Sequence, residues 1–248
     1  MKAMVLAAGL GTRLRPLTND RPKALVEVNG RTLLEITLLR LRGFGIHEVI
    51  VNAHHFADLL VAFLKAHDNF GMGIEVSRED VLLDTGGGLK KAGGFFLENS
   101  GGLDEPFLLH NVDVISTVDF TKMLHAHRQS QALATLAVHR RESSRQLLFN
   151  DEMRLCGRRA GNEKDPEIVC RAVHFEPLAF TGIHMISPRL LGLMTEDGIF
   201  SIIDCYLRLA GTQEKIAGFR ADEYYWRDLG RMQDLQQAGM DLEHQRPA

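Results

Sequence analysis

The N-terminal stretch, residues 1–23, constrains the fold more than any other part of the chain. A short apolar run with a β-branched residue, Met4-Val5-Leu6, is followed by small residues and by Gly9 and Gly11. An apolar run bounded by glycines is typical of a buried strand of an α/β sheet. The bare backbone N–H groups of such a turn can surround a phosphate group. The stretch therefore predicts a buried strand that ends in a phosphate-binding turn.

Cations follow this turn closely, since Arg13, Arg15, Arg21 and Lys23 lie within eleven residues. A glycine turn that leads into clustered cations suits a polyphosphate, and a tight turn followed by a solvated basic loop is the alternative. Two common phosphate motifs are absent. No Walker A loop occurs, and the dinucleotide fingerprint fails because Leu14 stands at its third glycine.

The same stretch resembles the signature of the sugar-phosphate nucleotidylyltransferases. That signature continues through Gly-Thr-Arg-Leu-x-Pro-Leu-Thr to Pro-Lys, and here it runs from Leu6 to Thr18 and then Pro22-Lys23. The resemblance implies that Arg13 stabilises a leaving pyrophosphate and that Lys23 stabilises the charge on an α-phosphate. It also implies that the turn binds a nucleotide through Leu6, Ala7, Ala8, Gly9, Gly11 and Thr12.

Strands alternate with helical patterns along the next part of the chain. Strands are expected at 26–28, 48–52 and 74–76, and helices after Thr32 and at 56–67. Thr32 and Glu35 have the spacing of a capping box. The alternation predicts an α/β fold with a mostly parallel sheet. With the resemblance, we expect a Rossmann-like nucleotidyltransferase fold, with a central mixed sheet flanked by helices and a small sugar-binding lobe.

A glycine-rich segment, residues 84–88, precedes the next helical pattern. Consecutive glycines where a helix begins favour close approach of a ligand to the backbone, and a flexible loop is the alternative. In the resembling family a loop at this place binds the base and ribose. The resemblance thus assigns Thr85, Gly86 and Gly87 to the nucleotide. The form of this loop is most similar to that of short members acting on N-acetylmuramate 1-phosphate or mannose 1-phosphate.

Two aspartates are candidate metal ligands. Asp113 follows Asn111 near the end of an apolar strand at 107–115, where an open α/β sheet binds its ligands. A turn-capping role is the alternative. The family has Asn-Gly-Asp here, so the resemblance implies that Asn111 binds the nucleotide and Asp113 binds Mg²⁺, although Val112 replaces the glycine. The family's Trp-x-Asp-x-Gly is matched by residues 226–230, and the resemblance implies that Asp228 is the second Mg²⁺ ligand, with a helix cap as the alternative.

The segment at 140–175 is polar, basic and irregular, and we expect it to form the smaller lobe over the active-site cleft. The family has Glu-Lys-Pro in that lobe, and the nearest match assigns the sugar phosphate to Lys164, with Arg171 as an alternative cation. The family's Phe-Thr/Ser-Gly-Ile assigns Thr181 and Gly182 to the sugar. A β-bulge at that glycine is the alternative.

The organisation expected is one nucleotidyltransferase domain over 1–248, with a nucleotide-binding half at 1–139 and a sugar-phosphate-binding half at 140–248. The sequence contains no hexapeptide repeat, so a C-terminal β-helix domain is not expected. The net charge of −3 gives no overall basic surface for nucleic acid. No apolar run is long enough for a membrane span, and the three cysteines show no disulfide or metal spacing. We therefore expect a cytoplasmic protein with reduced thiols. The sequence leaves open whether the protein is a homo-oligomer.

The chemistry implied is nucleotidyl transfer between a nucleoside triphosphate and a sugar 1-phosphate, with Mg²⁺ as cofactor. UTP with N-acetylmuramate 1-phosphate, or GTP with mannose 1-phosphate, is the favoured pair. Choline-phosphate cytidylyltransferases and heptose 1-phosphate guanylyltransferases have the same N-terminal signature and remain alternatives. A catalytically silent sugar-nucleotide sensor is an alternative of another class. The histidines at 54–55 and 125–127 are interpreted as surface residues, not as a zinc site.

Overall fold

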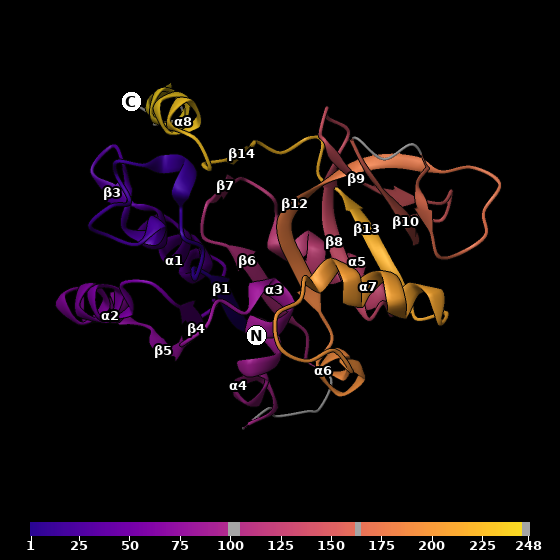
Figure 1. Cartoon of the computed structure of the whole chain (residues 1–248), viewed down its shortest axis with the longest axis horizontal. Coiled ribbons are helices and arrows are strands. Elements are labelled where there is room, and N and C mark those ends of the chain that lie inside the picture. The colour runs from indigo at the N-terminus through magenta and orange to yellow at the C-terminus, as the bar shows by residue number, and fades with distance from the viewer. Residues whose placement is uncertain (99–104, 162–164, 245–248) are drawn as a thin grey trace.

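The computed structural model describes residues 1–98, 105–161 and 165–244 (Figure 1). In this part of the chain, ten strands form one sheet. Its main path runs in the order β11 (Glu167–Ile168), β10 (Leu155–Ala160), β9 (Arg145–Phe149), β12 (Glu176–Ile186), β6 (Phe107–Asn111), β1 (Lys2–Leu6), β4 (Glu48–Ala53) and β5 (Gly73–Arg78). Off this path, β8 (Ala134–His139) pairs with β12, and β13 (Ile216–Arg220) pairs with β8.

Strand direction changes across the sheet. The strand of the N-terminal signature, β1, lies parallel to β4 on one side and to β6 on the other, and β4 lies parallel to β5. Beyond β6 the sheet turns mainly antiparallel, because β12 runs against β6, β8 and β9. The expected α/β fold with a central mixed sheet is confirmed, and β12 joins its parallel part to its antiparallel part.

Eight α-helices occur in the described residues. They are α1 (Leu33–Gly43), α2 (Ala57–Ala66), α3 (Asp84–Lys91), α4 (Gly93–Leu97), α5 (Phe120–Ser130), α6 (Arg189–Leu193), α7 (Ile202–Gly211) and α8 (Met232–His244). The expected N-cap of α1 is confirmed, since the Thr32 hydroxyl accepts a hydrogen bond of 3.1 Å from the Glu35 backbone N–H. Two short ladders complete the fold: β2 (Glu27–Val28) with β3 (Arg31–Thr32), and β7 (Val114–Ser116) with β14 (Trp226–Asp228).

The apolar core lies on both faces of the sheet. Alternation along β1 sends Ala3 and Val5 to a cluster with the leucines of α1, and sends Met4 to a second cluster with Leu89 of α3 and Tyr206 of α7. Because both of its faces are buried, β1 is apolar throughout its centre. In the described part of the chain no helix has the length and apolar character needed to cross a membrane.

The expected lobe at 140–175 extends the sheet. Its strands β9, β10 and β11 form one edge, on the side of the molecule opposite α2 and β5 (Figure 1). None of its described residues lines the large cavity at the carboxyl ends of β1, β4 and β6. The described strands of this segment pair with β12 and continue away from that cavity, and the expectation that the segment forms a lobe over the active-site cleft stays a prediction.

Two other expectations are corrected. His127 is buried, with 3% of its surface exposed, and its Nδ1 lies 2.9 Å from the Thr135 hydroxyl, whereas His125 on the same helix is exposed. Two residues along a helix change the direction of a side chain by about 200°, and only His125 meets solvent. Cys156 and Cys170 form a disulfide, with Cα atoms 4.8 Å apart. The strand pairing of β10 brings them together, so the expectation of reduced thiols is wrong for this pair.

Candidate active site

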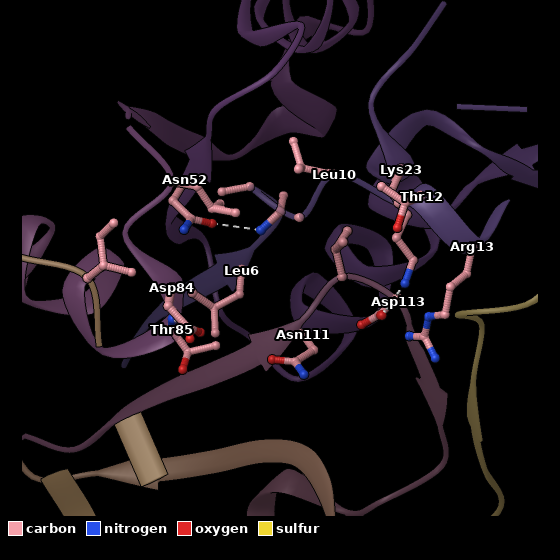
Figure 2. A pocket seen from close by; sticks show the side chains of 17 residues that line it. Leu6, Leu10, Thr12, Arg13, Lys23, Asn52, Asp84, Thr85, Asn111 and Asp113 are labelled. Atoms are coloured by element: carbon pink, nitrogen blue, oxygen red, sulfur yellow. Dashed lines mark hydrogen bonds and ion pairs between the residues drawn. The ribbon is translucent and has the colours of Figure 1, made fainter. Parts of the chain in front are cut away.

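A cavity of about 540 Å³ opens at the carboxyl ends of three parallel strands. The register places Leu6, the last residue of β1, beside Asn52 of β4 and beside Asn111 of β6. All three residues line the cavity (Figure 2). Parallel α/β sheets bind ligands at this end of their strands. The predicted turn residues also line it, namely Ala7, Ala8, Gly9, Gly11 and Thr12.

The two glycines of the turn differ in what surrounds them. A Cβ added at Gly9 would meet no atom within 4 Å, so the backbone there faces open space. A Cβ at Gly11 would lie 2.9 Å from Thr18 Cγ2 and 3.0 Å from Lys23 Cβ, and Gly11 has a positive φ of 62°. Gly9 therefore leaves room for a ligand, whereas Gly11 lets the chain pack against itself.

A buried hydrogen-bond relay holds the turn to the opposite wall. The Ala7 backbone N–H donates to Asn52 Oδ1 at 2.6 Å, and Asn52 Nδ2 donates to Glu79 Oε1 at 2.7 Å. The other carboxylate oxygen of Glu79 accepts from the Leu83 backbone N–H at 3.0 Å. Figure 2 shows the first of these bonds across the cavity floor. The sequence analysis missed Asn52 and Glu79; the signal was two polar residues at the ends of apolar strands.

Charged side chains gather at the other end of the cavity. Lys23 forms an ion pair with Asp113, and the guanidinium of Arg13 lies beside them (Figure 2). Lys23 is almost buried, with 7% of its surface exposed, so its charge acts in a partly dry environment. Val112, between Asn111 and Asp113, packs into the core, and its N–H donates to the Leu6 carbonyl at 3.1 Å. The branched side chain is therefore accommodated in this fold.

Asp228 comes to this end through the β7–β14 ladder. The Leu229 N–H donates to the Asp113 carbonyl at 2.7 Å, and Asp228 pairs with Val114. Burial, followed by the nearby charge of Asp113, raises the pKa of the Asp228 carboxyl. Gly230 leaves space here, because a Cβ added to it would lie 2.6 Å from Arg13 Nη2 and 2.9 Å from Asp228 Oδ1.

The two aspartates fit a hard divalent cation. Asp228 Oδ1 is buried without a hydrogen-bond partner, which is costly unless a ligand completes it. Within the described residues, no group of three or more His, Cys, Asp or Glu side chains could hold a metal ion. Mg²⁺ commonly uses only one or two protein carboxylates, together with substrate phosphates and water. The pair Asp113 and Asp228 has that character.

The glycines at 86–88 serve packing inside α3. A Cβ at Gly86 would lie 2.3 Å from the Phe200 ring, and one at Gly87 would lie 2.3 Å from the Gly198 carbonyl oxygen. The Gly86 N–H already donates to the Phe200 carbonyl at 2.9 Å. The space left by the absent side chains of Gly86 and Gly87 is thus filled by the protein itself, and their assignment to the nucleotide stays a prediction. Thr85 does line the cavity, although its hydroxyl accepts from the Ile202 N–H at 3.0 Å.

The residues predicted for the sugar have different surroundings. Thr181 is buried, and its hydroxyl donates to the Ala137 carbonyl at 2.8 Å, so its side chain is engaged within the sheet and its assignment to the sugar stays a prediction. Gly182 lies at a register shift of β12 with a φ of 82°, and a Cβ there would lie 2.7 Å from Asn111 Nδ2. The bulge interpretation is thus confirmed for Gly182. Lys164 lies outside the described residues.

Comparisons with known proteins agree with this geometry. The family model described as "Nucleotidyl transferase" matches residues 2–147. The N-acetylmuramate alpha-1-phosphate uridylyltransferase of Caulobacter vibrioides is 36% identical over 239 residues, which is 92% of this chain and 91% of the relative. The mannose-1-phosphate guanyltransferase of Yarrowia lipolytica is 27% identical over 237 residues, which is 95% of this chain and 62% of the relative.

A solved structure has the same fold. A putative glucose-1-phosphate thymidylyltransferase from Bacillus anthracis superposes with a TM-score of 0.79 at 18% identity. The match covers 100% of this chain and 97% of the other. The mixed sheet and its antiparallel extension are therefore a shared architecture.

Proposed function

This chain belongs to the nucleotidyl transferase family, and from this premise we propose that it joins a nucleoside triphosphate to a sugar 1-phosphate, giving a nucleotide sugar and pyrophosphate. The favoured pair is UTP with N-acetylmuramate 1-phosphate, because the Caulobacter relative matches over nearly its whole length and carries that activity in its name. GTP with mannose 1-phosphate is the second pair, supported by the Yarrowia relative.

The observation that carries the proposal is the meeting of two cations and two carboxylates beside one end of the cavity, which Arg13, Lys23 and Asp113 line. Lys23 and Asp113 are ion-paired there, Asp228 is held beside Asp113 by the β7–β14 ladder, and Arg13 lies against Gly230. These four side chains come from segments far apart in the sequence. A site that only binds a nucleotide has less need of two adjacent carboxylates.

The reaction requires charge and alignment more than proton transfer. An oxygen of the sugar phosphate attacks the α-phosphorus, the bond between the α-phosphorus and the bridging oxygen breaks, and pyrophosphate leaves. Because the nucleophile is already an anion at pH 7, no general base is required. Lys23 is placed to stabilise charge on the α-phosphate, and Arg13 is placed to stabilise the pyrophosphate. Fixed positions for the two anions supply the rest of the acceleration.

Asp113 and Asp228 would hold Mg²⁺. When bound, the ion supplies positive charge between the phosphate groups and a template for their alignment. The test has a readout besides turnover. With a non-hydrolysable UTP analogue present, Mg²⁺ should raise the melting temperature of the wild-type protein, and this rise should be lost in Asp228→Asn. An equal rise in both proteins would contradict the metal assignment.

The aromatic residues at 224–226 argue against a choline substrate. Tyr225 donates its hydroxyl to Asp241 at 2.7 Å, the Trp226 ring contacts Arg141, and the Tyr224 ring stacks near Phe219. The three rings face different partners, whereas a quaternary ammonium needs rings around one point. A heptose 1-phosphate remains an alternative substrate. A cytoplasmic location and a homo-oligomer stay predictions.

The experiment that tests the function is a matrix of pyrophosphate release. Purified protein with Mg²⁺ is given UTP, GTP, CTP, ATP or dTTP, each with N-acetylmuramate 1-phosphate, mannose 1-phosphate, glucose 1-phosphate, a heptose 1-phosphate or phosphocholine. Activity with one pair of nucleotide and sugar 1-phosphate, lost in Asp113→Asn, is the expected result. No release with any pair, while nucleotide binding persists, would replace the enzyme by the sensor alternative.

A further inference from the structure

Polar atoms without partners gather next to the charged end of the cavity. Seven buried side-chain nitrogen or oxygen atoms in the described residues have no hydrogen-bond partner. Four of them are Asn111 Oδ1, Asp228 Oδ1, His139 Nε2 and Arg141 Nε. Buried polar groups are nearly always paired, so a cluster of unpaired ones indicates a place for a polar ligand.

A short piece of β12 contacts Arg141, Trp226 and Asn111. The Phe180 carbonyl accepts from Arg141 Nη2 at 3.3 Å, and the Thr181 carbonyl accepts from Trp226 Nε1 at 2.8 Å. Gly182 lies directly against Asn111. The bulged part of β12 therefore sets the spacing of the residues around it. Its positive φ at Gly182 gives Asn111 the space that a side chain would fill.

Arg141 is the cation of this cluster. Its guanidinium carbon lies 4.1 Å from the centroid of the Trp226 ring, and its two hydrogen bonds, to backbone carbonyls, are long at 3.3 Å. No Asp or Glu side chain of the described residues forms an ion pair with it. Stacking on an aromatic face fixes the plane of a guanidinium and leaves its edge free for an anion.

Its neighbour Arg140 is different. Arg140 Nη2 lies 2.7 Å from Glu176 Oε1, and the Arg140 side chain is 73% exposed. The two consecutive arginines therefore differ in their surroundings. Arg140 is ion-paired at the surface, whereas Arg141 is half-buried near Asp228, whose Oδ1 has no hydrogen-bond partner. The charge of Asp228 acts on the guanidinium of Arg141, which places the two groups in one electrostatic environment.

We propose that Arg141, held flat on Trp226, binds the phosphate group of the sugar 1-phosphate. This inference rests on the proposed function. The nucleotide cavity lies on the side of Arg13, Lys23 and Thr85, and Arg141 does not line it. Since Trp226 and Asp228 are two residues apart in one strand, they project from the same face of β14. A phosphate beside Asp228 is thereby within reach of Arg141 from the side away from the nucleotide.

Guanidinium suits this task better than ammonium would. It offers parallel N–H donors that match two phosphate oxygens, whereas an ammonium is a single point charge. A half-buried charge is also more favourable when an anion completes it. Arg141 thus supplies the cation that the sequence analysis sought in Lys164 or Arg171.

The test compares Arg141→Met with the matched control Arg140→Met, which removes the same charge one residue away. In steady-state kinetics with the active pair, Arg141→Met should raise the KM for the sugar 1-phosphate about tenfold or more, the effect of losing a charge-assisted hydrogen bond. The KM for the nucleotide should change less than about twofold on the same scale. Arg140→Met should match the wild type, and Arg141→Lys should lie between. Equal KM values for the sugar 1-phosphate in Arg141→Met and Arg140→Met would overturn the proposal.

A second readout needs no turnover. Trp226 is the one tryptophan of the chain, so its fluorescence reports on the Arg141 stack. N-acetylmuramate 1-phosphate, mannose 1-phosphate and inorganic phosphate are titrated with and without a non-hydrolysable UTP or GTP analogue. A saturable change in the wild type and in Arg140→Met, shifted about tenfold or more in Arg141→Met, supports the proposal. No change in the wild type under any condition, or the same curve in all variants, overturns it. Absence of pyrophosphate release with every pair would instead contradict the proposed function.

Discussion

Lys23 and Asp113 form an ion pair across 90 residues of sequence, and this pair joins the N-terminal signature to the end of β6. The ammonium is almost buried, so neither partner is freely solvated. A ligand that binds the ammonium of Lys23 or the carboxylate of Asp113 separates the two charges, so the charge left behind needs a new partner. At this pair a substrate phosphate therefore competes with Asp113 for Lys23, and a cation competes with Lys23 for Asp113.

The first prediction concerns this pair. Lys23→Met and Asp113→Asn should each lower kcat by roughly 10²–10³-fold, the effect of removing one preorganised charge from a transition state. Both variants should keep the wild-type far-UV circular dichroism. The control is Arg21→Met, which removes a neighbouring cation that pairs with Asp20 at the surface. Near-normal turnover in Lys23→Met and Asp113→Asn would contradict their assignment.

The second prediction separates the two glycines of the turn. Gly9→Ala places a methyl group in open space, so the melting temperature should hold while nucleotide affinity falls. Gly11→Ala should lower the free energy of unfolding by about 1 kcal/mol or more, because it forces a side chain into a left-handed backbone and against Thr18. Thermal melting and nucleotide titration of both variants check this. A larger loss of stability in Gly9→Ala than in Gly11→Ala would reverse the interpretation.

The third prediction uses the relay from Ala7 to Leu83. Asn52→Asp brings a second carboxylate against Glu79, so the KM for the nucleotide should rise and stability should fall. Glu79→Gln alone leaves the Asn52 amide facing a second amide. Combining the two substitutions exchanges donor and acceptor. The new carboxylate at position 52 accepts from the Ala7 N–H and from the new amide at position 79, whose oxygen accepts from the Leu83 N–H. The double variant should therefore recover nucleotide KM relative to Asn52→Asp. Additive losses in the double variant would argue against the relay.

The fourth prediction is a pH dependence of stability. Burial lowers the pKa of His127 from 6.5 to about 4. The unfolded chain then binds a proton that the folded chain excludes, so the contribution of the neutral ring is complete above pH 6.5 and is lost as pH falls toward 4. The loss amounts to about 3 kcal/mol at most. His127→Asn lacks this titrating group, so its free energy of unfolding should fall less between pH 7 and pH 4 than that of the wild type. Acid unfolding of both proteins, each referred to its own stability at pH 7, checks this. His125→Asn, an exposed control on the same helix, should follow the wild-type acid profile.

Local sequence signals predicted much of the fold. The Thr32–Glu35 cap depends on residues three apart, and the apolar run at 4–6 depends on neighbours, so both could be read directly. His127 could not be placed in this way, because its burial depends on Thr135 of β8, eight residues on and across a packing interface. The pairing of Cys156 with Cys170 likewise depends on the strands between them.

The site followed the same division. A contiguous signature predicted that Ala7 to Thr12, Arg13 and Lys23 lie around one cavity, and the structure places them there. The packing of Gly86 against Phe200 could not be predicted from the sequence, because a missing side chain leaves room equally for a ligand or for a distant ring. Arg141 gave no local signal. Its candidate role can be recognised only in the folded chain, where β12 and β14 bring Phe180, Trp226 and Asp228 near it.

The length of β12 has a mechanical consequence. This one strand pairs with β6, which precedes residue 140, and with β9, which follows it. Load applied to either part is therefore transmitted along the β12 backbone, through the bulge at Gly182 that separates its β9-paired end from its β6-paired end. A closing motion between the two parts would have to bend or twist the sheet that β12 makes continuous between them. The two substrates accordingly meet on a surface whose spacing is largely fixed before either arrives.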